Sequence, residues 1–422
     1  MIKIRNYLIN KSESSPESSI LYWKHEVARH YVKLFFTIFC IFLAEPVFLR
    51  FNAMAQEITL EPFISVENFY NSNENMDAED ELDTNSIVLK PALALDYSSK
   101  LLFLQTRMQC NVWRYFDEKD LDREEQIYSL DGNYKLSDRW QLFGDFLFQD
   151  TNVSNFVDYA LEGGSSNVAR KGTQLARKSY DFGMGVADQL SKRSDTSLAY
   201  GYSKVEWDDP QADDYDGHSI IFSYDYRFTN QVDTITLKQG SNQTDSEKNK
   251  VDYYDLSLGW SHEISQIYAL YVSFGGGYVK THDIDEKVTE TSLDPIAEIN
   301  LSKTNTVFSW TIGCSRRSET TVGGETFDIN RIYWAPRIMV GRSVSVYCLF
   351  DYIRPDSVGV KDSSEANWAL KSQYFAVEPA VEYTINSDWS LSLAGDYTVH
   401  HEADRERLRG WITLRYKIPL GL

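Results

Sequence analysis

Residues 218–228, with the sequence HSIIFSYDYRF, alternate between apolar and polar side chains over almost their whole length. One face carries Ile220, Phe222, Tyr224, Tyr226 and Phe228, and the other carries Ser219, Ser223, Asp225 and Arg227. Because successive side chains of a β-strand point to opposite faces, this period of two predicts a strand between an apolar and a polar medium. The stretches 253–260 (YYDLSLGW) and 389–397 (WSLSLAGDY) repeat the pattern. We therefore expect many strands of one design.

The composition also favours an all-β fold. The chain has 422 residues, of which 42% are hydrophobic, with 27 Tyr, 22 Phe and 10 Trp but only 10 Pro. Aromatic residues favour strands, and helical periodicity is nearly absent from residue 58 onward. The formal net charge of -20 argues against nucleic acid as a partner, because phosphate recognition needs a basic surface.

Two kinds of connection alternate along the chain. Long acidic or glycine-containing loops are predicted near residues 71–85, 117–125, 151–177, 208–217, 242–250, 282–290, 318–325, 355–371 and 401–407. Short turns are predicted near residues 98–100, 137–138, 191–195, 229–230, 265–266, 303–305, 341–342 and 386–388. These connections join about 18 strands, within a range of about 16 to 20 if a hairpin is merged or missed. Long loops at one end and both termini at the other predict a transmembrane antiparallel up-and-down β-barrel.

Other architectures fit these features less well. A soluble sandwich or propeller also alternates, but it does not place every long connection at one end. A helical membrane protein needs an apolar run of about 18 residues, and none follows Gln56. Aromatic residues gather near predicted strand ends, where the lipid–water boundaries of a barrel would place them, at Tyr97, Trp113, Tyr134, Trp140, Tyr202, Trp207, Tyr268 and Trp389.

The N-terminal segment has the features of an export signal. Basic residues precede an apolar run at 34–44, and Ala53-Met54-Ala55 has the small-x-small form of a cleavage site. We therefore expect residues 1–55 to be a signal or targeting segment and residues 56–422 to form the barrel. An uncleaved membrane anchor is the alternative, because residues 47–51 lengthen the apolar run.

Aromatic strands followed by a Leu-Ser-Leu pattern recur at residues 254–260 and 389–393. In this pattern residues 56–422 resemble the outer-membrane β-barrel proteins of Gram-negative bacteria, and more narrowly the β-barrel porins associated with exopolysaccharide export. The resemblance implies outer-membrane lipid, the barrel assembly machinery and polysaccharide or export components as partners. Such barrels usually end in a strand that closes on an aromatic residue; here residues 412–422 alternate but end on Leu422, with Pro419 close to the end.

Reactive side chains give no catalytic or metal site. Cys40 lies in the targeting segment, and Cys110, Cys314 and Cys348 fall on the apolar face of their strands, which predicts free thiols in contact with lipid. We predict that His218, His282, His400 and His401 are solvated at the outer rim. No Gly-x-Ser-x-Gly or His-Glu-x-x-His sequence accompanies them, which disfavours the alternative of a lipid hydrolase. We expect no enzyme activity, no metal and no cofactor.

Two predicted loops are strongly acidic. Residues 71–85 and 208–217 hold six and five carboxylates and no Lys or Arg. Carboxylate clusters can hold divalent cations that bridge to lipopolysaccharide, although residues 208–217 fail the pattern of a calcium loop at its first and twelfth ligands. Simple solvated acidic loops that resist aggregation are the other interpretation.

The polar face of the predicted strands lines the lumen. Our candidates for selectivity are the charged residues Lys90, Arg107, Arg227, Lys238, Arg331, Arg337, Arg415, Lys417, Asp225, Asp255, Glu378 and Asp396. Acidic residues are in excess on this face, which favours cations weakly. Alternatively, these charges pair across strands and hold the shape of the barrel. Tyr253, Tyr333 and Trp113 also face inward, and residues 151–177 are the predicted constriction.

Three functions follow from these features. The first is a passive outer-membrane pore for hydrophilic solutes, including oligosaccharides or polysaccharides, in which lumen charges set selectivity. The second is a non-conducting barrel that scaffolds an envelope or exopolysaccharide-export assembly through its acidic loops. The third is the disfavoured lipid hydrolase.

Overall fold

A computed structural model describes residues 57–73, 82–153, 175–208, 214–246, 249–284, 287, 289–320, 326–358, 373–401 and 405–418. They form 18 strands and one short 3-10 helix. In chain order these are β1 (Glu57–Asn71), β2 (Thr84–Ser98), β3 (Leu102–Tyr115), η1 (Lys119–Leu121), β4 (Arg123–Lys135), β5 (Trp140–Val153), β6 (Leu175–Ser191), β7 (Ser194–Trp207), β8 (Tyr215–Arg227), β9 (Asp233–Ser246), β10 (Asn249–Glu263), β11 (Tyr268–Asp283), β12 (Thr289–Lys303), β13 (Phe308–Thr320), β14 (Thr326–Val340), β15 (Val344–Val358), β16 (Tyr374–Thr384), β17 (Trp389–His400) and β18 (Arg405–Lys417).

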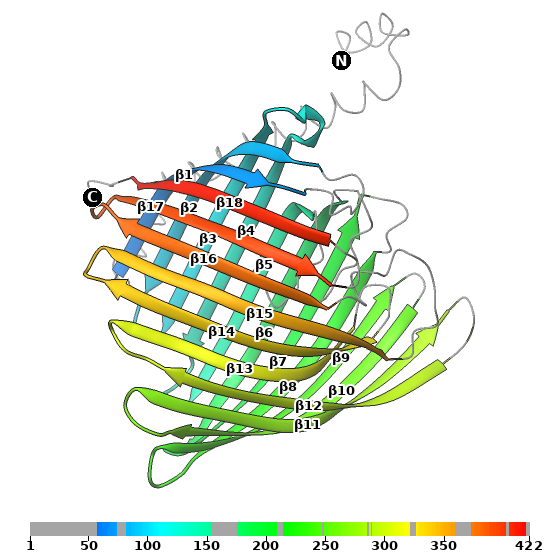
Figure 1. The fold of residues 1–422 in the computed structure, drawn as a ribbon. Helices are drawn as coiled ribbons and strands as arrows, with labels where there is room; N and C mark the ends of the chain where they lie inside the picture. Colours follow the sequence, from blue (N-terminus) through cyan, green and yellow to red (C-terminus); the bar gives the residue numbers. More distant parts are fainter. Residues whose placement is uncertain are drawn as a thin grey trace, which may run out of the picture. The chain divides into compact units, whose positions relative to one another are not determined.

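The strands form one closed antiparallel sheet. Consecutive strands pair with each other, and β1 also pairs with β18, so that Phe63 lies opposite Lys417 and Asn71 opposite Arg409. Figure 1 shows the blue β1 beside the red β18 where the barrel closes. The predicted all-β, up-and-down barrel of 18 strands is confirmed.

The eight predicted short turns all lie between paired strands, and local side chains close several of them. The Oγ of Ser137 accepts hydrogen bonds from the amides of Arg139 and Trp140, and Oδ1 of Asn386 does the same for Asp388 and Trp389. Such side-chain bonds mimic a backbone turn, which explains why the chain reverses within a few residues here.

The predicted long loop at residues 242–250 is wrong. β9 continues to Ser246 and β10 begins at Asn249, and the two strands pair up to Asp245 and Lys250. Similarly, β13 runs to Thr320 and β18 starts at Arg405, inside the predicted loops 318–325 and 401–407. The polar sequences of these stretches resemble loops, yet their backbones extend the ladder beyond the apolar part of each strand.

The outward face of the barrel is apolar. In β10, Leu256 and Leu258 are 53% and 39% exposed, and the register aligns them with Phe274 and similar residues of neighbouring strands. Cys110, Cys314 and Cys348 share this face and are free. A closed barrel satisfies its backbone groups internally, so a wide apolar belt of this kind suits the outer membrane. The predicted outer-membrane location is confirmed.

Aromatic residues mark the edges of the apolar belt, with two corrections. At the short-turn end, the ring of Trp389 stacks on that of Tyr416 with centroids 4.5 Å apart, on the outward face. Trp113 and Trp207, at the loop ends of β3 and β7, were also predicted at a lipid–water boundary, although Trp113 was in addition among the predicted inward aromatics. The register places both on the inward face, because Trp113 shares a face with Arg107 and Trp207 shares a face with the buried Val205.

Charge on the outward face should destabilise the barrel. We expect Leu198→Arg to lower the free energy of unfolding by about 2–4 kcal/mol, because Leu198 lies opposite Phe222 in the apolar belt and an arginine there would face hydrocarbon. The adjacent inward Ser197→Arg is the matched control and should cost little. Urea titration of the protein in vesicles, followed by tryptophan fluorescence, measures both. Equal losses for the two variants would contradict the assigned faces.

The targeting segment at residues 1–55 lies outside the described residues, as do most of the acidic loops and the predicted constriction. Among the residues that the structure describes, no helix has the length and apolar character that a membrane span requires.

Candidate functional site on the inward face

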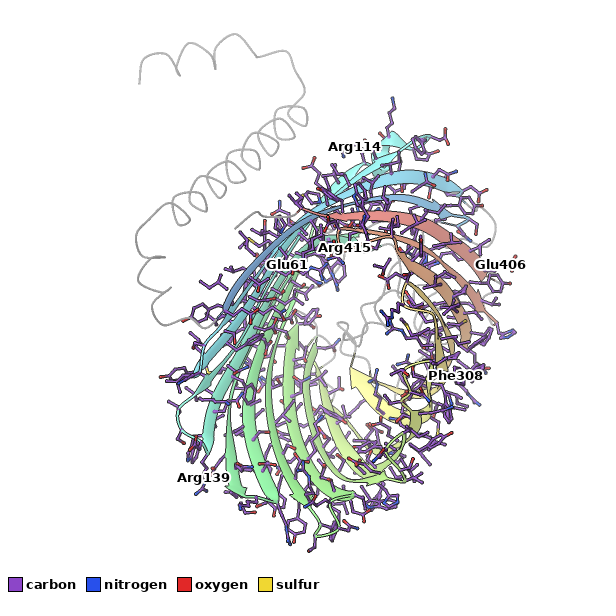
Figure 2. The ribbon with its side chains drawn as sticks, turned by 90° about the vertical axis from the view of Figure 1, so that its left-hand side faces the viewer. Glu61, Arg114, Arg139, Phe308, Glu406 and Arg415 are labelled. Atoms are coloured by element: carbon purple, nitrogen blue, oxygen red, sulfur yellow. The ribbon has the colours of Figure 1, made fainter. Side chains whose placement is uncertain are left out.

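All of the charged lumen candidates lie on the face opposite the exposed apolar residues. Residues that pair across neighbouring strands point to the same face. The register pairs Lys238 with Ser223 and Ser257, and Arg415 with Ser65. Figure 2 shows Arg415 on the inner side of the wall, whereas Arg114 and Glu406 lie on its outer side. The predicted face is therefore correct for each candidate; a role in selectivity stays a prediction.

Three of the predicted cations are tied to carboxylates of neighbouring strands. Nζ of Lys90 lies 3.0 Å from Oε2 of Glu67, and Lys417 pairs with Glu61. Arg331 makes a forked contact with Asp351, in which Nε donates to Oδ1 at 2.9 Å and one terminal nitrogen donates to Oδ2 at 2.7 Å. For these cations the geometry supports the interpretation that lumen charges pair across strands and stabilise the wall.

Asp396 belongs to a cluster that sequence analysis missed in part. Its carboxylate accepts hydrogen bonds from Nε of Arg409 at 3.2 Å and from the hydroxyl of Thr398 at 3.1 Å. A terminal nitrogen of Arg407, whose side chain is fully buried, lies 3.8 Å away. Arg407 was assigned to a loop. Arg407 lies an even number of positions from Arg409 and Arg415, and this was the signal in the sequence that all three share one face of the strand.

The remaining candidates lie singly along the wall. Asp225 accepts a hydrogen bond from Thr236 on the next strand. Asp255 lies opposite Gly240 on β9, where a Cβ would collide with its carboxylate, so the glycine leaves room for Asp255 in its present position. Glu378 lies on the inward face of β16. Among the described residues, Arg227, Lys238 and Arg337 have no carboxylate within 4.0 Å.

Two arginines converge on one aromatic ring. The guanidinium carbon of Arg415 lies 4.0 Å from the ring centroid of Phe63, and that of Arg107 lies 5.4 Å from the same centroid. Arg107 donates to Oε1 of Gln109 at 2.9 Å, and neither arginine has a carboxylate within 4.0 Å among the described residues. We call Phe63, Arg107 and Arg415 the arginine pair site. Because both side chains are exposed on the inward face, their donors remain available to a solute.

An aromatic row extends from this site toward the loop end. The ring of Phe69 lies 5.5 Å from that of Trp113 and 5.9 Å from that of Trp411. Arg123 covers the Trp113 ring at 4.3 Å and is paired with Glu125 at 3.0 Å. Arg123 and Glu125 were missed because they fell in a predicted loop. Of the predicted inward aromatics, Tyr333 donates its hydroxyl hydrogen to Asn300 at 3.0 Å across the strand between them.

The histidines occupy different environments from one another. His401 is exposed, as expected, but His400 is wholly buried beside the ring of Tyr374 at 5.4 Å. The prediction that His400 is solvated is wrong, because β17 continues to this residue and pairs it with Tyr374. His218 faces outward, and its Nδ1 lies 2.8 Å from the hydroxyl of the outward-facing Tyr200.

The prediction of no metal site can be compared with only part of the chain. Within the described ranges, His, Cys, Asp and Glu side chains form no group that could hold a metal ion. Most of the acidic stretches 71–85 and 208–217 lie outside those ranges, so their proposed role with divalent cations and lipopolysaccharide stays a prediction.

No protein-family model matches the chain, and no curated protein matches its sequence. Solved structures match its fold. A BenF-like porin from Pseudomonas fluorescens Pf-5 is 8% identical with a TM-score of 0.51, over 87% of this chain and 100% of that chain. OpdQ from Pseudomonas aeruginosa is 7% identical with a TM-score of 0.50, over 87% of this chain and 100% of that chain. At these identities the likeness concerns the fold alone, and this chain has the closed antiparallel β-barrel fold of an outer-membrane porin.

Proposed function

We propose that this protein is a passive outer-membrane pore for hydrophilic solutes, and that oligosaccharides or polysaccharides with acidic groups are among them. The arginine pair site carries the proposal. Two exposed guanidinium groups without a carboxylate partner among the described residues offer a carboxylate-bearing solute forked, charge-assisted hydrogen bonds. A barrel of about 18 strands is wide enough to hold an aqueous channel.

The neighbouring aromatic row favours sugars among the hydrophilic solutes. Phe69, Trp113 and Trp411 follow the arginine pair site along the same three strands toward the loop end, and the ring face of Trp113 lies beside Arg123. A sugar has an apolar ring face and polar edges, so alternating aromatic and cationic side chains complement it. Association with an exopolysaccharide-export assembly is a further part of this proposal, which rests on the sequence resemblance.

The pore is tested by the conductance of the purified protein in a planar lipid bilayer. We expect stable open steps, because polar and charged side chains predominate on the inward face. Addition of an oligogalacturonate should produce brief closures, while a neutral maltooligosaccharide of the same length should produce fewer. Ion selectivity follows from the reversal potential under a salt gradient.

A silent bilayer would reject the pore, provided that the protein is folded and its gel mobility changes on boiling. That outcome would favour the alternative of a barrel that scaffolds an envelope assembly. Equal closures by the acidic and the neutral sugar would leave a pore but reject the preference for acidic solutes.

A further inference from the structure

The wall of the barrel has an incomplete seam between β12 and β13. β12 pairs with β11 from Thr289 to Lys303, and β13 pairs with β14 over its whole length. Between each other, however, β12 and β13 pair only from Ala297 to Lys303 and from Trp310 to Arg316. Toward the loop end, residues 289–296 therefore have no ladder to β13 within the described part of the chain. We call this region the β12–β13 seam; both strands are labelled in Figure 1.

Local sequence explains why the ladder stops. Pro295 lies two residues beyond Ala297, and proline carries no amide hydrogen, so it is found in sheets at edges and bulges. On the other side, Arg316 is the last residue of β13 that pairs with β12, and it forms an ion pair with Asp328 of β14. Above this point β13 therefore pairs only with β14, and β12 pairs only with β11, among the described residues.

The outer surface beside the seam is apolar up to its edge. Leu293, on the unpaired part of β12, is 79% exposed, and Phe274 on β11 is 62% exposed; both face outward with Ile299. This surface continues the lipid-facing belt. On β13, by contrast, Arg316 ends the outward apolar run, so the seam begins at the upper boundary of the belt. Unpaired backbone is tolerated there because water can reach it, whereas it would be costly deeper in the hydrocarbon.

The two sides of unpaired β12 have opposite chemistry. Leu293 faces outward, and the next residue, Asp294, faces inward, where it accepts a hydrogen bond from Ser292 at 3.1 Å. Asp294 is only 3% exposed, so a molecule at the seam meets an apolar surface toward the bilayer and the partly exposed Ser292, not the carboxylate, toward the lumen. That combination suits an amphiphile. A β-strand from another protein fits less well, because Pro295 interrupts the edge to which it would add.

We propose that the β12–β13 seam is a lateral portal, which admits the acyl chain of an outer-leaflet amphiphile from the bilayer to the inward face. This goes beyond the axial passage of hydrophilic solutes and does not depend on it. The exposed side chains of Phe274 and Leu293 extend the apolar surface past the upper boundary of the belt, at the height where β12 and β13 have no ladder between them.

Acyl-chain contact at the inward face tests the portal directly. Ile296 on β12 and Ser257 on β10 both lie opposite Gly275 of β11, so they share one height and one face, on either side of the same strand. Each would be replaced by Cys in a background without Cys110, Cys314 and Cys348, and labelled with bimane. The proteins would be placed in phosphatidylcholine vesicles in which the acyl chains carry bromine, which quenches bimane on contact.

We expect bimane at Ile296→Cys to be quenched several-fold more than bimane at Ser257→Cys, and to approach the lipid-facing Leu256→Cys. Quenching at Ile296→Cys no greater than at Ser257→Cys would overturn the portal. If bimane disturbs the fold, a photoactivatable benzophenone residue at Ile296 replaces it. Crosslinking of this residue to lipid is then compared between positions 296 and 257. More crosslinking at 296 supports the portal, and equal crosslinking overturns it.

Discussion

Replacing Arg107 and Arg415 with glutamine is expected to weaken binding of an acidic oligosaccharide in the lumen by about 10-fold or more for each arginine. Hydrogen bonds to charged groups contribute about 1.5–3 kcal/mol each, and about 1.4 kcal/mol corresponds to a tenfold change in affinity. Both arginines lie over Phe63 and have no carboxylate to restrain them among the described residues, so a solute carboxylate would be their main partner. The frequency and length of oligogalacturonate closures in single-channel records measure the change.

The same double variant should shift the reversal potential toward the equilibrium potential of the cation, which means that the pore becomes more cation-selective. The reason is that two positive charges are removed from a lumen that already carries many carboxylates. Arg114→Gln is the matched control: Arg114 faces outward, with its side chain 51% exposed, and pairs with Glu124. It should leave both measurements unchanged. A double variant that behaves like Arg114→Gln would show that the arginine pair site does not contact the permeating solute.

Sequence analysis predicted those features of the barrel that depend on local patterns. The period of two in residues 218–228 assigns each side chain to a face without knowledge of any partner strand, and β8 has those faces. Short turns such as 137–138 and 386–388 were also found, since a Ser or Asn closes each through its own neighbours. Strand number follows from these two signals together.

Features that depend on register or on regions beyond the apolar belt were not predictable in this way. Residues 242–250 have polar side chains on both faces, so nothing in their pattern separates a loop from a strand that extends past the membrane. Contacts between distant strands, such as Glu67 with Thr413, require the closure of β1 on β18. The arginine pair site needs that closure too, because its residues come from β1, β3 and β18.

Removing the carboxylate of Asp351 is expected to destabilise the barrel by about 3 kcal/mol, the largest loss that we predict for a single lumen residue. Its side chain is fully buried and that of Arg331 is 21% exposed, so Asp351→Ala leaves a largely buried guanidinium without its partner. Breaking a buried pair from one side typically costs about 3–5 kcal/mol, and the partial exposure of Arg331 places this pair at the low end. The urea midpoint of the protein in vesicles measures the loss.

Lys417 and Glu61 provide the matched comparison, because this pair also joins two strands on the inward face but is 44% and 35% exposed. Glu61→Ala should cost less than about 1 kcal/mol, as exposed ion pairs do. The double variant Arg331→Met, Asp351→Leu should recover much of the loss, since no unpaired charge remains. If Asp351→Ala costs no more than Glu61→Ala but changes ion selectivity, Arg331 acts on the permeating ion and does not mainly stabilise the wall. If the predicted loss is found with selectivity unchanged, the paired charges maintain the shape of the barrel, and discrimination between solutes is left to unpaired cations such as Arg107 and Arg415.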